Sequence, residues 1–516
     1  MNGAHALLAT LRANGVTTCF ANPGTSEMHV VAALDDDKDL RAVLCLYEGV
    51  ATGAADGYAR VTGGPASTLL HLGPGLANGW ANLHNARRAQ VPLLNIVGDH
   101  ATYHAAVDAP LQSNIESLAR GLEGWYGRPT SPDDVPQAVA NALEAAYGPP
   151  GRVATLALPA DVAWGEATAT TWPLVPRPSP DGFDERVLDR ALVALRSHHC
   201  VLLLGGGALV KDQLNLAQRV AAATSSRLMM ENFATIMDRG NGVVSPERVI
   251  YVSEFAVDQL KETEVLILVG SRAPVGFFAY ANVPSRLAPE SCEVINLAPP
   301  GSDTLGALQA LVDALEAPPV PVELGERTAA PSGELTPRSL CAAVGATLRE
   351  GVIVADEANT TGVHLFGETR FSPPHQWMTL TGGAIGYGLP AAVGAAIGSN
   401  RRVLALESDG SMMYTLQALW TMAREGLDIT VVALANRSYA VLTWERSRVG
   451  PTPEGAPSEQ LFSLEDPALD LAALARAQGV PGVQVRTAEE LVQELERSYD
   501  TPGPSFIEAV LPRGLN

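Results

Sequence analysis

Two short apolar runs joined by one helical segment, between residues 403 and 444, set the fold class of this 516-residue chain. The first run, Val403–Leu406, leads into Ser-Asp-Gly-Ser, which is typical of a strand followed by a turn. Residues Met412–Arg424 carry apolar side chains at helical spacing. The second run, Ile429–Leu434, reads as a buried strand that ends near Asn436. A strand, a helix and a strand in this length predict a βαβ unit with parallel strands and a right-handed crossover.

Polar residues follow both predicted strands at their carboxyl ends, where open α/β sheets bind ligands. Asp409 offers a carboxylate oxygen, Asn436 offers an amide oxygen, and Ser438 can add its backbone carbonyl. Mg²⁺ prefers six oxygen ligands and often shares its shell with phosphates. Gly410 allows the backbone to approach a phosphate closely, and Ser411 stands where the next helix begins. An Asp-Gly pair alone is more often an ordinary turn; the asparagine that ends the second strand favours a metal and phosphate site.

Strands alternate with helices along the rest of the chain, which predicts three doubly wound parallel-sheet domains of the α/β class. Two Pro-rich segments, 171–181 and 317–337, indicate linkers and leave domains at 1–170, 183–316 and 338–516. The further strands that we predict are Thr17–Ala21, Arg41–Leu46, Ser67–His71, Pro92–Val97, Val153–Leu158, Cys200–Leu204, Arg227–Met230, Val265–Val269, Val352–Ala355 and Ser505–Val510.

Charge and cysteine content exclude several classes of protein. The formal net charge of -21, from 35 basic and 56 acidic residues, argues against nucleic acid or an anionic membrane as a partner. Five cysteines lie far apart without a C-x-x-C pair, which fits a reducing compartment and argues against a structural zinc site. No apolar run reaches membrane-spanning length, and the N-terminus lacks a signal-peptide pattern. We therefore expect a cytoplasmic globular protein.

Three polar residues of the first domain each follow a predicted strand, so Thr25, Glu48 and His71 can share one rim. Glu48 begins a helix of small residues, and the helix macrodipole favours a glutamate there whatever its function. A single histidine is as typical of a satisfied structural residue as of a proton donor. The position of His71 beside Gly73 at a strand end favours the functional interpretation.

The stretch from Ser408 to Asn436 resembles the thiamine diphosphate motif, a Gly-Asp-Gly followed at about this distance by Asn-Asn. Ser408 replaces the first glycine and Ala435 replaces the first asparagine, whereas the positions of the presumed metal ligands match. Residues 47–60 resemble the signature around the glutamate of thiamine diphosphate-dependent 2-oxo acid enzymes. The resemblance covers nearly the whole chain, and its nearest branches are acetolactate synthase large subunit-like proteins and benzoylformate decarboxylases.

This resemblance implies a cofactor site made from the first and third domains. In the family the glutamate matched by Glu48 contacts the aminopyrimidine ring and favours the tautomer that removes the thiazolium C2 proton. Gly383 matches the residue whose carbonyl accepts a bond from the aminopyrimidine, and Ile385 matches the apolar residue that bends the cofactor. The implied metal ligands are Asp409, Asn436 and Ser438. The other implied cofactor contacts are Pro23, Asn78, Asn359, Thr360, Gly410, Ser411 and Tyr439.

The resemblance also implies a substrate pocket. Residues 22–27 look like the decarboxylase opening, in which Thr25 takes the place of a pocket serine, and His71 matches a pocket histidine. The second pocket histidine of that branch is absent, because Phe277 and Phe278 stand there, and Glu445 replaces an aromatic residue. The expected catalytic residues are thus Glu48, His71 and Thr25. The expected pocket residues are Phe277, Phe278, Leu442 and Glu445.

The activity that follows from the resemblance is decarboxylation of a 2-oxo acid with thiamine diphosphate and Mg²⁺. The resemblance also implies that a homodimer is the smallest active form and that a homotetramer, which is usual in the family, is expected. Attack on a second carbonyl then gives a 2-hydroxy ketone, which two water-excluding phenyl rings favour. The alternatives are simple aldehyde release, a flavin-dependent oxidase of the same architecture, and a non-catalytic cofactor-binding partner subunit. Gly205–Gly207 lacks the full G-x-G-x-x-G spacing, so we expect neither FAD nor another dinucleotide there.

Overall fold

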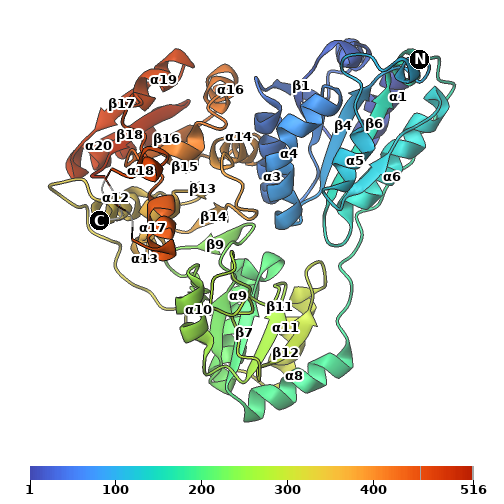
Figure 1. Cartoon of the computed structure of the whole chain (residues 1–516). Helices are drawn as coiled ribbons and strands as arrows, with labels where there is room; N and C mark the ends of the chain where they lie inside the picture. Colours follow the sequence, from blue (N-terminus) through green and yellow to red (C-terminus); the bar gives the residue numbers. More distant parts are fainter. Residues whose placement is uncertain (452, 454, 514–516) are drawn as a thin grey trace. The chain divides into compact units, whose positions relative to one another are not determined.

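The computed structural model describes residues 1–451, 453 and 455–513. Its contacts divide the chain into two compact units. The first comprises Met1–Arg177, Arg327–Thr369 and Thr379–Asn516, and the second comprises Pro178–Glu326 and Arg370–Met378. The first unit holds an N-terminal and a C-terminal sheet, and the second holds a central sheet, so the predicted α/β class is confirmed (Figure 1). The boundaries of the three domains remain a prediction.

The N-terminal sheet has the strand order β2-β1-β3-β4-β6-β5, and its neighbours pair in parallel. Its strands are β1 (Thr18–Asn22), β2 (Arg41–Leu44), β3 (Ser67–Leu70), β4 (Leu93–Asp99), β5 (Trp125–Gly127) and β6 (Val153–Pro159). Its helices are α1 (Gly3–Ala13), α2 (Met28–Leu34), α3 (Glu48–Thr62), α4 (Leu72–Ala89), α5 (Ile115–Arg120), α6 (Val135–Tyr147) and α7 (Ala160–Trp164). The predicted strands lie within two residues of those observed, whereas the short, half-buried β5 has no apolar run and was missed.

One face of this sheet holds the main hydrophobic core of the N-terminal half. Apolar residues of α1, α2, α6 and α7 pack there against residues of β1, β3, β4 and β6. Helices α3 and α4 pack with each other and with β1 and β4. The carboxyl ends of β1, β2 and β3 therefore place Thr25, Glu48 and His71 along one edge, as the sequence predicts.

The C-terminal sheet includes the strand order β17-β18-β16-β15-β13, and these neighbours also pair in parallel. Its strands are β13 (Ile353–Glu357), β15 (Val403–Ser408), β16 (Ile429–Ala435), β17 (Gly482–Val485) and β18 (Ser505–Val510). Its helices are α12 (Pro337–Thr347), α13 (Leu365–Glu368), α14 (Gly388–Ser399), α15 (Asp409–Met412), α16 (Ala418–Glu425), α17 (Ala440–Val449), α18 (Pro457–Gln460), α19 (Leu471–Ala477) and α20 (Ala488–Asp500). The parallel pairing of β15 with β16 confirms the predicted βαβ unit.

The crossover inside that unit differs from the prediction of one helix over Met412–Arg424. Helix α15 ends at Met412 and α16 begins at Ala418. Between them the Thr415 hydroxyl donates to the Gly386 carbonyl at 3.0 Å, and turn bonds replace the helical ladder. Strand β13 also extends two residues further than predicted, so Glu357 lies in the sheet and not in the loop that follows.

Small residues explain how α3 and α14 approach each other. A Cβ added at Gly57 would lie 2.1 Å from the Ala391 carbonyl oxygen, and one added at Gly394 would lie 1.8 Å from the Ala54 carbonyl oxygen. Backbones at this separation exclude any larger side chain at either glycine. The two helices therefore join the N-terminal and C-terminal halves of the first unit through backbone contact.

The second unit carries a parallel sheet of order β10-β8-β7-β11-β12. Its elements are α8 (Glu185–Ser197), β7 (Cys200–Leu204), α9 (Lys211–Thr224), β8 (Arg227–Met230), β10 (Glu247–Arg248), α10 (Ser253–Leu260), β11 (Val265–Val269), β12 (Glu293–Ala298) and α11 (Thr304–Ala314). Strand β9 (Met237–Arg239) pairs antiparallel with β14 (His375–Thr379). Across the described ranges of the chain, no helix has the length and apolar character needed to cross a membrane.

Candidate cofactor and active site

Asp409 and Asn436 lie at the carboxyl ends of the adjacent strands β15 and β16, as predicted. Asp409 is 3 % exposed, and its carboxylate accepts the Gly410 N–H at 2.8 Å and the Arg437 N–H at 2.6 Å. Burial raises the pKa of Asp409 to about 6, although the two N–H groups oppose this shift. A cation placed before this carboxylate would favour its charged form. The Asn436 side-chain oxygen, which accepts the Ser438 N–H at 3.0 Å, is the second oxygen ligand on offer.

A left-handed residue and hydrogen bonds to backbone carbonyl and side-chain groups fix the turn that follows Asn436. Arg437 has a φ of 54°, which is left-handed and turns its N–H towards Asp409. The Ser438 hydroxyl and the Tyr439 N–H both donate to the Phe462 carbonyl, at 3.2 and 2.9 Å. A Cβ at Gly410 would lie 2.4 Å from the Tyr439 ring, so only glycine fits there. The turn and the strand end thus form one rigid edge.

The predicted diphosphate contacts gather at the same edge. Asn359, which has a φ of 48°, donates from its side-chain amide to the Ser408 hydroxyl at 3.0 Å and to the Ser411 hydroxyl at 3.1 Å. Thr360 is the next residue, in the 3₁₀ turn that follows β13. A carboxylate, an amide oxygen, a backbone carbonyl and hydroxyl donors therefore meet here. This donor set fits Mg²⁺ with a diphosphate, which needs hard oxygen ligands and polar contacts to its own oxygens.

Glu48 is the first residue of α3 and is 8 % exposed. Its Oε2 accepts the side-chain amide of Asn78 at 3.0 Å. Its Oε1 makes no hydrogen bond among the residues that the structure describes. The Tyr47 hydroxyl donates to the Asn78 carbonyl at 3.0 Å, so Asn78 is held from both ends. The structure thus joins two predicted residues, Glu48 and Asn78, and leaves one carboxylate oxygen available to a ligand.

His71 caps α4 and contacts a buried carboxylate that sequence reasoning missed. Its Nδ1 lies 2.8 Å from Glu27 Oε2 and 3.1 Å from the Ser26 hydroxyl. Glu27 is 1 % exposed and also accepts the Gly24 N–H at 2.7 Å and the Ser26 hydroxyl at 2.5 Å. This contact directs the Nε2 of His71 away from Glu27. Thr25 is exposed in the same turn, and Pro23 precedes it.

From the sequence, Glu27 could have been identified only as the residue that closes the turn after the first strand. The motif Asn22–Glu27 follows a strand, and its carboxylate at the third position of a short helix caps Gly24. The sequence signals that cap, but it does not signal the contact with His71, which is 44 residues away.

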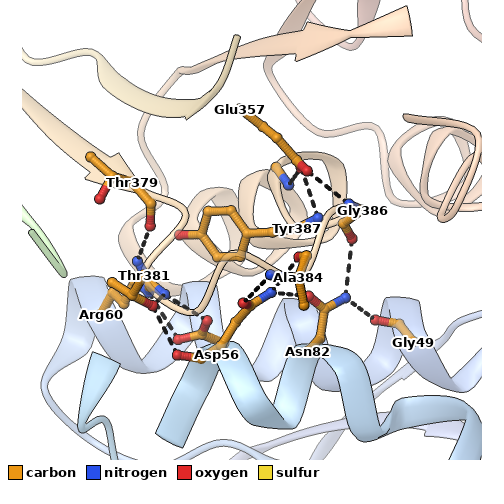
Figure 2. A network of polar contacts seen from close by, with 12 residues as sticks. Gly49, Asp56, Arg60, Asn82, Glu357, Thr379, Thr381, Ala384, Gly386 and Tyr387 are labelled. Atoms are coloured by element: carbon orange, nitrogen blue, oxygen red, sulfur yellow. Dashed lines mark hydrogen bonds and ion pairs between the residues drawn. The ribbon is translucent and has the colours of Figure 1, made fainter. Parts of the chain in front are cut away.

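Gly383 and Ile385 lie in the loop between β14 and α14. Figure 2 shows this loop bonded on one side near Asn82 and on the other at Glu357. Asn82 and Asn85 of α4 bond to its backbone, and Glu357 accepts N–H groups at its end. The Gly383 carbonyl has no hydrogen-bond partner among the described residues. Ile385 is half-buried and packs on Leu380, Tyr387 and Ala391. An available carbonyl beside a fixed apolar side chain fits the predicted contact with an aminopyrimidine.

The predicted pocket residues fall in different units. Phe277 and Phe278 belong to the second unit, where they are 41 % and 56 % exposed. The Phe277 ring contacts those of Phe278, Phe233 and Tyr251, with centroid distances of 5.1 to 5.7 Å. In the first unit, α17 carries Leu442, which is 42 % exposed, and Glu445, whose carboxylate lies 3.6 Å from Arg448. Their place in a substrate pocket remains a prediction.

The Gly205–Gly207 turn of the second unit already holds a carboxylate. The Gly206 N–H donates to Glu231 Oε1 at 3.2 Å, and a 3₁₀ helix follows instead of an α-helix. Phosphate-binding turns of dinucleotide sites instead direct such N–H groups at the ligand from an α-helix start. Glu231 therefore stabilises this turn in the position where a phosphate would compete with it.

Comparison with known proteins identifies both halves of the first unit. Residues 1–119 match the N-terminal domain of thiamine pyrophosphate enzymes, and residues 359–509 match their C-terminal domain. A Mycobacterium tuberculosis protein named "Putative acetolactate synthase large subunit IlvX" is 48 % identical, over 99 % of both chains. The benzoylformate decarboxylase of Pseudomonas aeruginosa is 29 % identical, over 96 % of both. The structure of a Rhodococcus jostii thiamine diphosphate-dependent 4-hydroxybenzoylformate decarboxylase aligns with a TM-score of 0.85, 23 % identity and full coverage of both chains. The chain belongs to the family of thiamine pyrophosphate enzymes that contains acetolactate synthases and benzoylformate decarboxylases.

Proposed function

We propose that this protein decarboxylates a 2-oxo acid with thiamine diphosphate and Mg²⁺ and ligates the product to a second carbonyl compound, giving a 2-hydroxy ketone. The observation that carries the proposal is that the first unit contains two sets of polar groups suited to binding the two ends of the cofactor. These are the buried Glu48, with one available oxygen, and the Asp409–Asn436 edge with hard oxygen ligands. The presence of both argues against a non-catalytic partner subunit.

In this proposal the Asp409 carboxylate, the Asn436 amide oxygen and the Ser438 carbonyl hold Mg²⁺, and through it the diphosphate. Asn359, Thr360, Gly410 and Ser411 contact the diphosphate oxygens, with Tyr439 and Pro23 beside the cofactor. When bound, thiamine diphosphate supplies the nucleophilic carbon and the electron sink for decarboxylation. Glu48, whose Oε1 makes no hydrogen bond among the described residues, would orient the aminopyrimidine and share a proton with its ring nitrogen.

Among the described residues, no hydrogen bond links Glu48 to Asp409 within one chain. We propose that each cofactor lies between the Glu48 edge of one subunit and the Asp409 edge of another, which makes a homodimer the smallest active form and a homotetramer the expected assembly. Phe277, Phe278, Leu442 and Glu445 are proposed to line the substrate pocket, with the phenyl rings against an apolar substituent. The protein is proposed to act in the cytoplasm. It is also proposed to act without flavin, because the Glu231 carboxylate already accepts the Gly206 N–H in the glycine turn.

A second candidate, aldehyde release, is favoured by one specific observation. His71 is held by Glu27, Ser26 and the tight approach of Gly24, where a Cβ would lie 2.3 Å from Nδ1. An oriented imidazole with its Nε2 directed outward can deliver a proton to a carbanion-like centre, which leads to aldehyde. A second histidine to assist it is absent at Phe277 and Phe278. Ligation therefore remains the first candidate.

A product assay distinguishes the two candidates. Purified protein with thiamine diphosphate and Mg²⁺ is supplied with a panel of aliphatic and aromatic 2-oxo acids, and carbon dioxide, aldehyde and hydroxy ketone are measured. We expect hydroxy ketone to exceed aldehyde when an acceptor is present. In His71→Gln the aldehyde fraction should fall further, whereas Phe278→His should raise it. Aldehyde as the main product, insensitive to added acceptor, contradicts ligation. No carbon dioxide from any 2-oxo acid contradicts the proposed function.

A further inference from the structure

The loop Thr381–Tyr387 is bonded from two sides by side chains that the sequence motifs leave unassigned. On the side of α4, the Asn85 amide donates to the Ala384 carbonyl at 2.8 Å, and the Ala384 N–H donates back to Asn85 Oδ1 at 3.2 Å. The Asn82 amide donates to the Gly386 carbonyl at 3.1 Å and to the Gly49 carbonyl at 2.9 Å. The backbone of the loop is therefore fixed to helices α3 and α4 (Figure 2).

On the other side a single carboxylate, that of Glu357, closes the loop. Its Oε1 accepts the Gly386 N–H at 2.8 Å, and its Oε2 accepts the N–H groups of Tyr387 at 2.8 Å and of Gly388 at 2.7 Å. Gly386 has a φ of 90°, which turns consecutive N–H groups to one side. Glu357 is 1 % exposed, so removing the carboxylate would leave buried N–H groups without their acceptor, which is costly. Three donors on one carboxylate define the backbone between Ile385 and the start of α14.

The bonds leave the two predicted cofactor contacts available. The carbonyls of Gly382, Ala384 and Gly386 accept bonds from α4 side chains, whereas the Gly383 carbonyl accepts none among the described residues. Ile385 stands directly before the residues that Glu357 holds. A shift of the Gly386 backbone would move both the Ile385 side chain and the Gly383 carbonyl, since the loop between them is short and anchored.

We propose that Glu357 is a positioning residue that holds the Gly383 carbonyl and the Ile385 side chain in place for the aminopyrimidine half of the cofactor. The inference rests on the proposed function. It makes the Glu357 carboxylate specific for one half of the ligand, because that carboxylate makes no hydrogen bond to a described residue of the Asp409 edge, where the diphosphate half binds. At that edge the Glu357 backbone carbonyl accepts the Ser408 hydroxyl at 3.0 Å, a bond that a side-chain substitution leaves in place. Glu357 acts through the loop backbone and touches no reacting atom.

The test compares two ligands, thiamine diphosphate and inorganic pyrophosphate, each with Mg²⁺, by titration calorimetry. In Glu357→Gln we expect thiamine diphosphate to bind roughly ten- to a hundredfold more weakly, because the amide cannot accept all three N–H groups. Pyrophosphate affinity should change less than about threefold. Glu508→Gln is the matched control. Glu508 is a fully buried carboxylate of β18 that accepts the Ala472 N–H at 2.9 Å at the start of another helix. It should cause no loss selective for thiamine diphosphate: the Glu508 charge contributes to raising the pKa of Asp409, so any effect on Mg²⁺ should fall on both ligands equally.

Two outcomes overturn the inference while leaving the proposed function intact: parent-like thiamine diphosphate affinity in Glu357→Gln, or an equal loss for both ligands, which indicates general damage. A parent that fails to bind thiamine diphosphate overturns the proposed function and this inference together. If Glu357→Gln does not fold, hydrogen exchange of the ligand-free parent decides. The amides of Gly386, Tyr387 and Gly388 should then be protected, and exchange as fast as in an exposed loop overturns the inference.

Discussion

Buried glutamates of the first unit differ in how their carboxyl groups are satisfied. Glu27 and Glu357 each make several hydrogen bonds, so donors within the protein stabilise both carboxylates. Among the described residues, Asn78 is the one hydrogen-bond partner of the two Glu48 carboxylate oxygens. A buried carboxylate with an available oxygen is costly unless a ligand completes it. Glu407 also lacks a described partner for either oxygen, but it is fully buried, whereas Glu48 keeps some exposure. This difference supports the proposal that Glu48 acts on the ligand, while Glu27 and Glu357 hold the structure around it.

At the residue scale, Glu48→Gln should therefore separate activation from binding. The amide keeps the shape of the side chain but cannot share a proton with the aminopyrimidine ring. We expect exchange of the cofactor C2 proton to slow by about 10²–10⁴-fold, with thiamine diphosphate affinity near that of the parent. Proton exchange is followed by NMR after acid quenching, and affinity by calorimetry. Exchange at the parent rate would remove Glu48 from this role.

At the scale of elements, β13 and β15 place two carboxyl groups side by side in the C-terminal sheet. Glu357 and Glu407 are register partners on these strands, and both are buried. Burial first, and the neighbouring charges second, raise the pKa of Glu407 well above its ordinary value. Burial also raises the pKa of Glu357 to about 7, although three N–H groups oppose the shift. Neither oxygen of Glu407 makes a hydrogen bond among the described residues, whereas Glu357 accepts three N–H groups, so the surroundings favour the neutral form more at Glu407 than at Glu357.

This pair predicts how stability depends on pH. A carboxyl group whose pKa is raised by folding stabilises the folded state fully below its unfolded pKa and loses that contribution as pH rises through its folded pKa. The Glu407→Gln variant has no carboxyl group at this position, so it does not lose this stability as the pH rises. Its unfolding midpoint relative to the parent should therefore increase as the pH rises above the ordinary pKa of a glutamate, by at most about 1.4 kcal/mol per pH unit in free energy.

Scanning calorimetry at one scan rate measures these midpoints, because a chain of this size does not unfold in a single reversible step. Glu508→Gln again serves as the control, since Glu508 makes hydrogen bonds to the Ala472 N–H and to Gln484. Its loss should lower the midpoint without a gain at high pH. A constant difference between Glu407→Gln and the parent at every pH contradicts a raised pKa of Glu407 in the folded protein.

Much of the element structure could be predicted from the sequence, because strands such as Cys200–Leu204 and Ser505–Val510 are apolar runs with clear ends. The Asp409–Asn436 edge could be predicted as well, since both residues directly follow such runs. Glu27, Glu357 and Glu407 could not, because their partners are set by the tertiary fold. Glu357, for instance, meets Gly386 only once α14 has packed on β13. The break at Thr415 was missed for the same reason, since its partner is also Gly386.

At the scale of the whole molecule, the first unit carries both halves of a cofactor site on different sheets. Glu48 begins a helix beyond the N-terminal sheet, and Asp409 directly follows a strand of the C-terminal sheet. Helices α3 and α14 join these halves by backbone contact, so the two edges cannot move independently within a chain. If the cofactor lies between subunits, each chain contributes one half to each of two sites.

That arrangement predicts complementation between two inactive variants. Glu48→Gln chains lack the activating carboxylate and Asp409→Ala chains lack the metal ligand, so each homodimer should be inactive and Asp409→Ala should not retain the cofactor. In a mixed dimer one site receives both substitutions. The other pairs Glu48 of the Asp409→Ala chain with Asp409 of the Glu48→Gln chain and is intact. Random mixing in equal amounts should restore roughly a quarter of parental decarboxylation per chain, because half of the dimers are mixed and one of their two sites is intact.

The measurement is carbon dioxide release after the two variants are dissociated together and reassembled, with each variant treated alone as a control. A second mixture, of Glu48→Gln with a chain carrying both substitutions, provides the matched negative control, because every site in it lacks Glu48. Activity in the first mixture and none in the second would establish a site shared between subunits. No recovery in the first mixture, when differently tagged chains co-purify as mixed dimers, would place Glu48 and Asp409 of one chain in the same site and contradict the proposed assembly.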